Sequence, residues 1–311
     1  MGPEFSNETS VSAGSPPRKT FLEQYGISPV LFAFLSLLLL FVLYQGLGGL
    51  VTVLLFGLKP SVETAAGFRI ATLMGQVLLL LLPALFLTRL ATLTPASFLR
   101  LRAPRVREVI LPLFGIFSLQ QILQVYMAVQ EKISLPQSVQ PIVEDLKRII
   151  EESYKLLVGS SSVPELLFVV LVVAAVPAAA EEFLFRGLVQ RSFEQKLGSS
   201  KSLVLTSIVF GIYHLNPFSI IPLICLGMYL GFLVNRSGSI WVSVAAHFYN
   251  NLFACIALYF GMNDNFVVTG NPENLSGGML AFTFLSFSAV FLISTYYFMF
   301  VTKPVIPSTE T

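Results

Sequence analysis

The sequence predicts an all-α, polytopic membrane protein, and its composition and the grouping of its apolar residues are the two observations that predict it. Hydrophobic residues make up 55% of the 311 residues and charged residues only 12%, whereas a soluble domain carries roughly one quarter charged residues. The apolar residues gather into long runs, and a helix of about 20 such residues crosses a bilayer core. The net charge of +2 gives no basic field of the kind that indicates a nucleic-acid partner.

Eight apolar runs are the candidate transmembrane helices, called spans one to eight below. The fifth run is the shortest and contains a histidine, which suits a helix that ends inside the protein. The eight runs are residues 30–57, 70–90, 108–129, 163–190, 202–216, 218–235, 239–261 and 278–302.

The runs predict one transmembrane domain over residues 30–302, with its catalytic half at about 163–260. Residues 1–29 are polar and rich in Ser, Gly and Pro, which predicts a disordered tail, and residues 1–5 read as a cloning remnant. Residues 303–311 are expected to form a cytoplasmic tail.

The charges between the spans predict the orientation of the chain. Loops rich in Lys and Arg stay in the cytoplasm, and the link between spans two and three is the most basic one. The loops on the other side are neutral or acidic, so both termini are expected in the cytoplasm. The basic residues are Arg18 and Lys19 before span one, Arg89 at the end of span two and Arg100, Arg102, Arg105 and Arg107 after it, Arg191, Lys196 and Lys201 after span four, Arg236 after span six and Lys303 after span eight.

The segment between spans three and four predicts an amphipathic helix at the membrane surface. Its apolar residues recur at helical spacing and its charges lie on the opposite face. Nothing in its residues carries chemistry, so a surface connector is the expected role. The apolar positions are Ile142, Leu146, Ile149, Ile150 and Leu157.

Ionisable residues inside the spans are the candidate site, because each costs a few kcal/mol at bilayer depth. Glu182 and Arg186 form an i,i+4 pair with the acid first, the favourable order for an ion pair along one helix face. Glu181 projects about 100° away from Glu182 and is free to meet another helix, which makes it the candidate base. The only two histidines, His214 and His247, both lie in apolar runs.

The positions of these residues along their spans allow them to meet. At 1.5 Å of rise per residue, His247 lies roughly 12 Å, His214 roughly 18 Å and Glu181 roughly 14–24 Å from the cytoplasmic ends of their spans. Asn251 follows His247 by one helical turn and shares its face. The three ionisable side chains are therefore expected to converge in the inner half of the membrane.

The sequence lacks the residues that other intramembrane chemistries need. The only aspartates are Asp145 and Asp264, both in predicted loops, which excludes a paired-aspartate protease. The chain has no His-Glu-x-x-His zinc motif and no Gly-x-Ser-x-Gly nucleophile turn. Water activated by Glu and His, with or without a metal, is what remains.

Three motifs in order resemble those of the CAAX protease and bacteriocin-processing family, which includes the Ras-converting CAAX prenyl endopeptidases. They are Glu181-Glu182-x-x-x-Arg186, Phe210-x-x-x-His214 and His247-x-x-x-Asn251. The resemblance covers about residues 163–260 and uses every histidine of the chain. It implies an eight-helix, glutamate-type intramembrane endopeptidase in a prokaryotic cell membrane, with a site that opens to the cytosol.

The resemblance also implies a role for each motif residue. Glu181 and His214 would activate the water, while His247 and Asn251 would stabilise the oxyanion. Glu182 and Arg186 would hold the site in shape, with Phe210 in support. The expected partners are membrane lipid and a peptide or lipidated protein, prenylated or leader-bearing, with no cofactor and no nucleic acid.

Three other functions remain open on the sequence. Glu181, His214 and His247 make a two-His, one-carboxylate set that could hold zinc with one open position. A non-catalytic scaffold or immunity factor would keep the motifs for packing alone. A proton-relaying transporter would also place ionisable groups in the membrane, although the chain shows no internal repeat.

Overall fold

The protein is a multi-pass bundle of membrane-spanning helices. The computed structural model describes residues 18–57, 61–133, 136–261 and 276–302. In this part of the chain, seven helices are long and apolar enough to cross a membrane, and Ser199–Tyr213 is a shorter apolar helix. No strand is present among the described residues, whose one β-bridge joins Leu101 to Ser239. The predicted fold class is confirmed.

Each predicted span corresponds to one observed helix or to a run of joined helices. Several spans change from α- to π-helix and back, so they comprise several elements. Span one is α2 (Pro29–Phe41), η1 (Val42–Gly48) and α3 (Gly49–Phe56); span two is η2 (Val62–Thr64), α4 (Ala65–Gly75), η3 (Gln76–Leu81) and α5 (Leu82–Ala91); span three is α7 (Val106–Gln130). Span four is α9 (Val163–Val169), η4 (Val170–Ala175), α10 (Val176–Glu182), η5 (Phe183–Val189) and α11 (Gln190–Leu197); spans five to eight are α12 (Ser199–Tyr213), α13 (Ile220–Ser237), α14 (Ile240–Tyr259) and α15 (Gly277–Val301).

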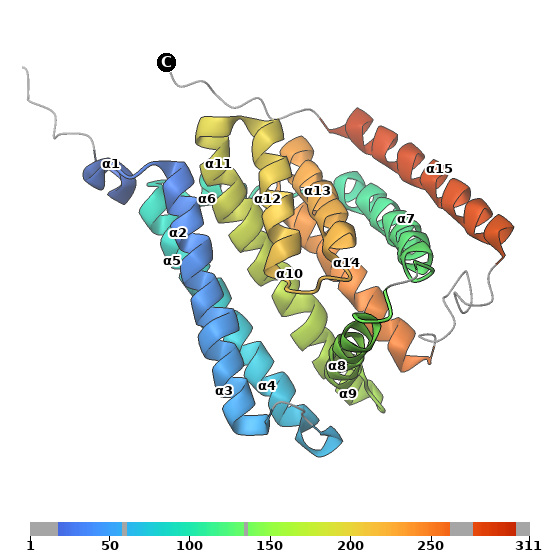
Figure 1. Cartoon of the computed structure of the whole chain (residues 1–311). Coiled ribbons are helices and arrows are strands. Elements are labelled where there is room, and N and C mark those ends of the chain that lie inside the picture. The colour runs from blue at the N-terminus through green and yellow to red at the C-terminus, as the bar shows by residue number, and fades with distance from the viewer. Residues whose placement is uncertain (1–17, 58–60, 134–135, 262–275, 303–311) are drawn as a thin grey trace, which may run out of the picture.

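Span four runs through the middle of the bundle and carries the candidate site. Figure 1 shows spans one and two at one edge of the molecule and α7 with α15 at the other edge. α10 packs against η3 of span two on one side and against α14 on the other. The site residues on span four therefore lie between the N-terminal spans and the C-terminal helices.

α12 and α13 approach each other closely because glycines line their contact. A Cβ on Gly211 would lie 2.6 Å from Ile224 Cγ1, and a Cβ on Gly227 would lie 3.2 Å from the Cα of Ser207. Small residues of this kind are what let membrane helices pack backbone to backbone. The close contact holds the C-terminal end of α12, where His214 lies, against its neighbour.

The predicted amphipathic helix is α8 (Gln140–Val158). Its C-terminal end is fixed by Arg69 of α4, whose guanidinium donates to the carbonyl oxygens of Leu156, Leu157 and Gly159. The same guanidinium pairs with Glu165 at 2.6 Å. Span two was predicted to begin at residue 70, after this arginine. It begins earlier because Glu165 and the helix-end carbonyls neutralise the buried charge.

Two further boundaries differ from the prediction. The N-terminal tail was expected to be disordered to residue 29, but Phe21–Tyr25 form α1, begun by a capping box between Thr20 and Glu23, while residues 1–17 lie outside the described residues. Span four was expected to end at residue 190 but continues to Leu197. Its last turns stay ordered because Glu194 binds Arg100 at 2.8 Å and Arg191 at 2.6 Å.

The loops that were predicted to be cytoplasmic lie together at one end of the bundle. Short α6 (Pro95–Phe98) lies in the basic loop between spans two and three. In the same loop Arg100 binds Asn235 and Glu194, and its carbonyl accepts from the N–H of Ile240. Arg236 donates to the carbonyl of Thr302 at the end of α15. The predicted alternation of loops between two sides agrees with this placement.

Cysteine labelling tests which side this end faces. In a background without Cys225 and Cys255, cysteines at the exposed positions Ser97 and Ser200 should resist an impermeant thiol reagent added outside intact cells. A cysteine at the exposed Ser138, between α7 and α8, should react, because positive loops stay inside. Labelling of Ser97 and Ser200 with protection of Ser138 would invert the orientation.

Candidate active site

Two adjacent glutamates of span four face different surroundings. Glu182 is fully buried, whereas the side chain of Glu181 is 21% exposed. They end α10 and lie between two π-helical segments, η4 and η5. An extra residue in a helical turn of this kind is frequent at functional sites. The predicted separation of the two carboxyl groups onto different stripes of the helix is observed.

Glu182 has three partners, two of which join span four to α14. Its Oε1 accepts from Arg186 at 2.8 Å and pairs with Nδ1 of His247 at 2.9 Å, and its Oε2 accepts from the hydroxyl of Ser243. Arg186 donates in addition to the carbonyl of Gly227 on α13, at 3.0 Å. The Glu182–Arg186 pair is as predicted from its spacing. The bonds to Ser243 and His247 were not predicted.

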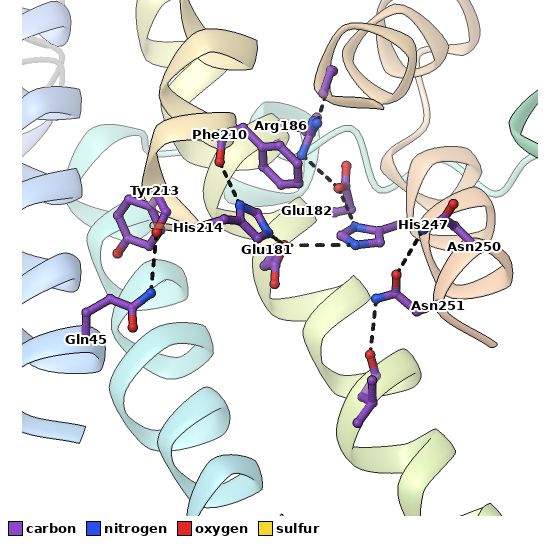
Figure 2. Close-up of polar contacts among 12 residues, drawn as sticks. Gln45, Glu181, Glu182, Arg186, Phe210, Tyr213, His214, His247, Asn250 and Asn251 are labelled. Atoms are coloured by element: carbon purple, nitrogen blue, oxygen red, sulfur yellow. Dashed lines mark hydrogen bonds and ion pairs between the residues drawn. The ribbon is translucent and has the colours of Figure 1, made fainter. Parts of the chain in front are cut away.

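Ser243 could have been found from the sequence. Together with His247 and Asn251 it forms one i,i+4 stripe on α14, so all three side chains project toward the same neighbour. Because Glu182 is already paired with Arg186, its carboxylate acts as an acceptor, and His247 donates from Nδ1. The remaining ring nitrogen, Nε2, is then turned toward Glu181 (Figure 2).

Glu181 lies next to both histidines. Its Oε2 is 3.5 Å from Nε2 of His214 and 3.9 Å from Nε2 of His247. The same oxygen has no hydrogen-bond partner among the described residues. The structure therefore brings together the three ionisable residues that the sequence singled out, from span four, α12 and α14.

A backbone contact fixes the orientation of His214. Its Nδ1 is 2.7 Å from the carbonyl oxygen of Phe210, and because a carbonyl only accepts, Nδ1 carries the proton. In the neutral ring Nε2 is then an acceptor that faces Glu181. The sequence placed His214 inside a span, but it lies just after α12, which ends at Tyr213. At a helix end the ring can turn back onto the carbonyl of the preceding turn.

Phe210 is fully buried at the centre of the site. The guanidinium of Arg186 lies 4.5 Å from its ring centroid, and the rings of His214 and His247 are 4.6 and 6.2 Å away. An aromatic face of this kind attracts a desolvated cation. Phe210 thus contacts Arg186 through its ring and His214 through both ring and carbonyl.

The charges of the cluster balance if one histidine is protonated. Arg186 offsets one of the two glutamates, which leaves one negative charge in a medium where an unpaired charge is costly. Nδ1 of His247 faces the Glu182 carboxylate at 2.9 Å, and its Nε2 lies 3.9 Å from Glu181 Oε2. A protonated His247 would present an Nε2–H donor beside Glu181.

Asn251 binds span four rather than the ionisable residues. Its Nδ2 donates to the carbonyl of Val173 at 3.1 Å, and its Oδ1 accepts from Asn250 at 3.2 Å. Pro177 has no N–H to donate to the carbonyl four residues before it, which is that of Val173. The contact leaves one N–H of the carboxamide for another acceptor, and Figure 2 shows the amide nitrogen on the side that faces span four.

Replacing Asn251 by aspartate should destabilise the protein, because a carboxylate oxygen would face the Val173 carbonyl in place of a donor. The expected loss is about 1–3 kcal/mol, typical of a buried acceptor left without its donor. Thermal unfolding measures it, with Asn216→Asp as the control, because Oδ1 at that position still accepts from the N–H of Phe218. Equal melting of both variants would contradict a structural role for the Asn251 contact.

A cavity of about 160 Å³ opens beside the catalytic candidates. Glu181 and His214 line one part of it, and Tyr44 and Gln45 from span one and Tyr213 line another. The sequence singled out none of the last three. The sequence indicates a binding role for these three residues only weakly, because Tyr and Gln occur in membrane helices for packing as well as for binding.

A metal site needs several ligating side chains that converge on one point. Within the described ranges, no group of three or more His, Cys, Asp and Glu side chains is arranged to hold a metal ion. Nδ1 of each histidine is occupied, by Phe210 and by Glu182, so only the Nε2 atoms and the Glu181 carboxylate could turn toward one.

Known proteins resemble the part of the chain that carries these residues. Residues 163–253 match the family described as type II CAAX prenyl endopeptidase Rce1-like. This match contains all three motifs and confirms the resemblance over that segment. An uncharacterized protein of Bacillus subtilis strain 168, YyaK, is 32% identical over 125 residues, which cover 34% of this chain and 41% of the length of that relative. No solved structure matches the chain.

Proposed function

We propose that this protein is an intramembrane endopeptidase in which Glu181 and His214 activate a water molecule. The observation that carries the proposal is the 3.5 Å separation of Glu181 Oε2 and His214 Nε2 at the edge of a cavity. Both groups line the same cavity, so a water molecule held there can donate an O–H group to either of them. The family match over residues 163–253 supports peptide-bond hydrolysis as the reaction.

The remaining residues would act on the developing charge. Glu181 takes a proton from the water as its oxygen attacks the scissile carbonyl, and the carbonyl oxygen becomes an oxyanion. Nε2–H of a protonated His247 and the second N–H of Asn251 would stabilise it, and fixed donors in a dry site are worth several kcal/mol. Glu181 then returns the proton to the leaving amine, and the peptide bond breaks.

The substrate we propose is a membrane-associated peptide with a lipidated C-terminal sequence. The site lies among membrane-spanning helices, so a substrate held at the bilayer reaches it more readily than a soluble one. We further propose that both termini and the cavity face the cytosol, because the basic loops gather at one end. Glu182, Arg186 and Phe210 would keep the two histidines in position.

Purified protein in lipid nanodiscs tests the proposal with a fluorescence-quenched peptide that ends in a farnesylated Cys-aliphatic-aliphatic-X sequence. We expect cleavage, with a lower KM than for the same peptide without the lipid, and activity that survives a metal chelator. A folded protein that cuts neither peptide would favour a scaffold or immunity role instead. Activity lost on chelation and restored by zinc would favour a zinc hydrolase built on Glu181, His214 and His247.

A further inference from the structure

We infer that span one supplies a substrate-binding subsite, formed by Tyr44 and Gln45, that holds the main chain of the peptide beside the scissile bond. The inference rests on the proposed peptidase function and deepens it. Both residues lie outside the segment that matches the protease family, which begins at residue 163. They nevertheless share a cavity with Glu181 and His214.

The local shape of span one directs both residues toward the site. They lie in η1, a π-helical segment, and η1 packs against η3, the π-helical segment of span two, which in turn packs against α10. The ring of Tyr44 lies against Gly75 of span two, where a Cβ would come to 3.4 Å from Tyr44 Cε2. Extra residues in these turns move the side chains out of the lipid-facing register and into the cavity.

Gln45 is the only carboxamide in span one, and its placement leaves it with spare capacity to bind. Its Nε2 reaches the carbonyl of Tyr213 at a long 3.4 Å, next to His214 (Figure 2). One acceptor and one donor of the carboxamide remain. Among the described residues, the Tyr213 hydroxyl on the same cavity is also without a partner. Polar groups without partners cost free energy inside the membrane, so their position at the site indicates that a ligand pairs with them.

A peptide substrate carries the hydrogen-bond partners that these groups lack. To be cut it must be extended at the scissile bond, so its N–H and C=O groups lose their helical partners. Away from water each such group needs a partner supplied by the protein. The catalytic residues serve the scissile carbonyl, whereas Gln45 Oε1 can accept a flanking N–H and the Tyr44 hydroxyl can donate to a flanking carbonyl. The proposed ligand is therefore the peptide backbone of the substrate, whatever its side chains are.

Steady-state kinetics with the farnesylated peptide test the subsite. Gln45→Met and Tyr44→Phe keep size but remove one hydrogen-bonding group each, so KM should rise about 5- to 10-fold while kcat stays within about twofold. The matched controls Gln120→Met and Tyr126→Phe, on α7 away from the cavity, should change neither constant.

Peptides N-methylated at single amides beside the scissile bond separate binding from a structural effect. One N-methyl group should raise KM for the wild type and have no further effect on Gln45→Met, since the contact is already gone. Equal penalties in both proteins, or an unchanged KM in Gln45→Met and Tyr44→Phe, would overturn the subsite while leaving the peptidase standing. A wild type that cuts no peptide would remove both.

Discussion

Glutamine in place of Glu181 should abolish nearly all peptide cleavage while leaving the protein folded. Glutamine keeps the size of the side chain but cannot take a proton from water, and loss of a general base costs about 10²–10⁴ in rate. Glu181 Oε2 has no hydrogen-bond partner among the described residues, so little stability depends on its charge. The kcat for the farnesylated peptide and the melting temperature measure the two effects.

Glu152→Gln is the matched control for the loss of one carboxylate, because Glu152 is exposed on α8. It should leave both the rate and the melting temperature unchanged. Cleavage by Glu181→Gln at a near wild-type rate would show that the base lies elsewhere. Cleavage lost together with the fold would instead make Glu181 a packing residue, as the scaffold alternative requires.

The buried pair of Glu182 and Arg186 should give the largest loss of stability. Both side chains are fully buried, and removing one leaves the other as an unpaired charge, which costs about 3–5 kcal/mol. Glu182→Gln and Arg186→Met should therefore each lower the melting temperature strongly. Arg148→Ala is the control, because its pair with Asp145 is exposed and should cost about 1 kcal/mol or less.

The double variant of Glu182 and Arg186 separates stability from activity. Removing both charges together should recover much of the stability lost by either single change, since no lone charge remains. Activity should stay low, because His247 has then lost the carboxylate that orients its ring at 2.9 Å. A single variant that melts like the wild type but is inactive would instead assign that residue to the chemistry.

Residue spacing predicted much of the site because these relations hold between residues of the same helix. Glu181 and Glu182 diverge by one helical step, Glu182 and Arg186 share a face, and the run lengths located the spans to within a few residues, apart from the ends of spans two and four. Spacing within α14 also aligned His247 with Asn251. Each of these relations follows from the pitch of an α-helix, which the chain carries wherever it is helical.

Contacts between distant spans were not predictable in the same way. Arg69 lies in span two because Glu165 and the end of α8 neutralise it, and those partners are far along the chain. The π-helical segments that turn Tyr44 and Gln45 into the cavity depend on the packing of spans one and two against span four. A change of helical pitch has no local signature in an apolar run, so this part of the cavity emerged only from the structure.

Hydrolysis in ¹⁸O-labelled water is the most direct test of water activated by Glu181 and His214. The purified protein in nanodiscs, with a chelator present, is given the farnesylated peptide, and mass spectrometry identifies the products. We predict cleavage at a single peptide bond, with ¹⁸O from the solvent in the new carboxylate and no peptide hydroxamate when hydroxylamine is added. Absence of cleavage, or a peptide hydroxamate released from an acyl–protein intermediate by hydroxylamine, would contradict this mechanism.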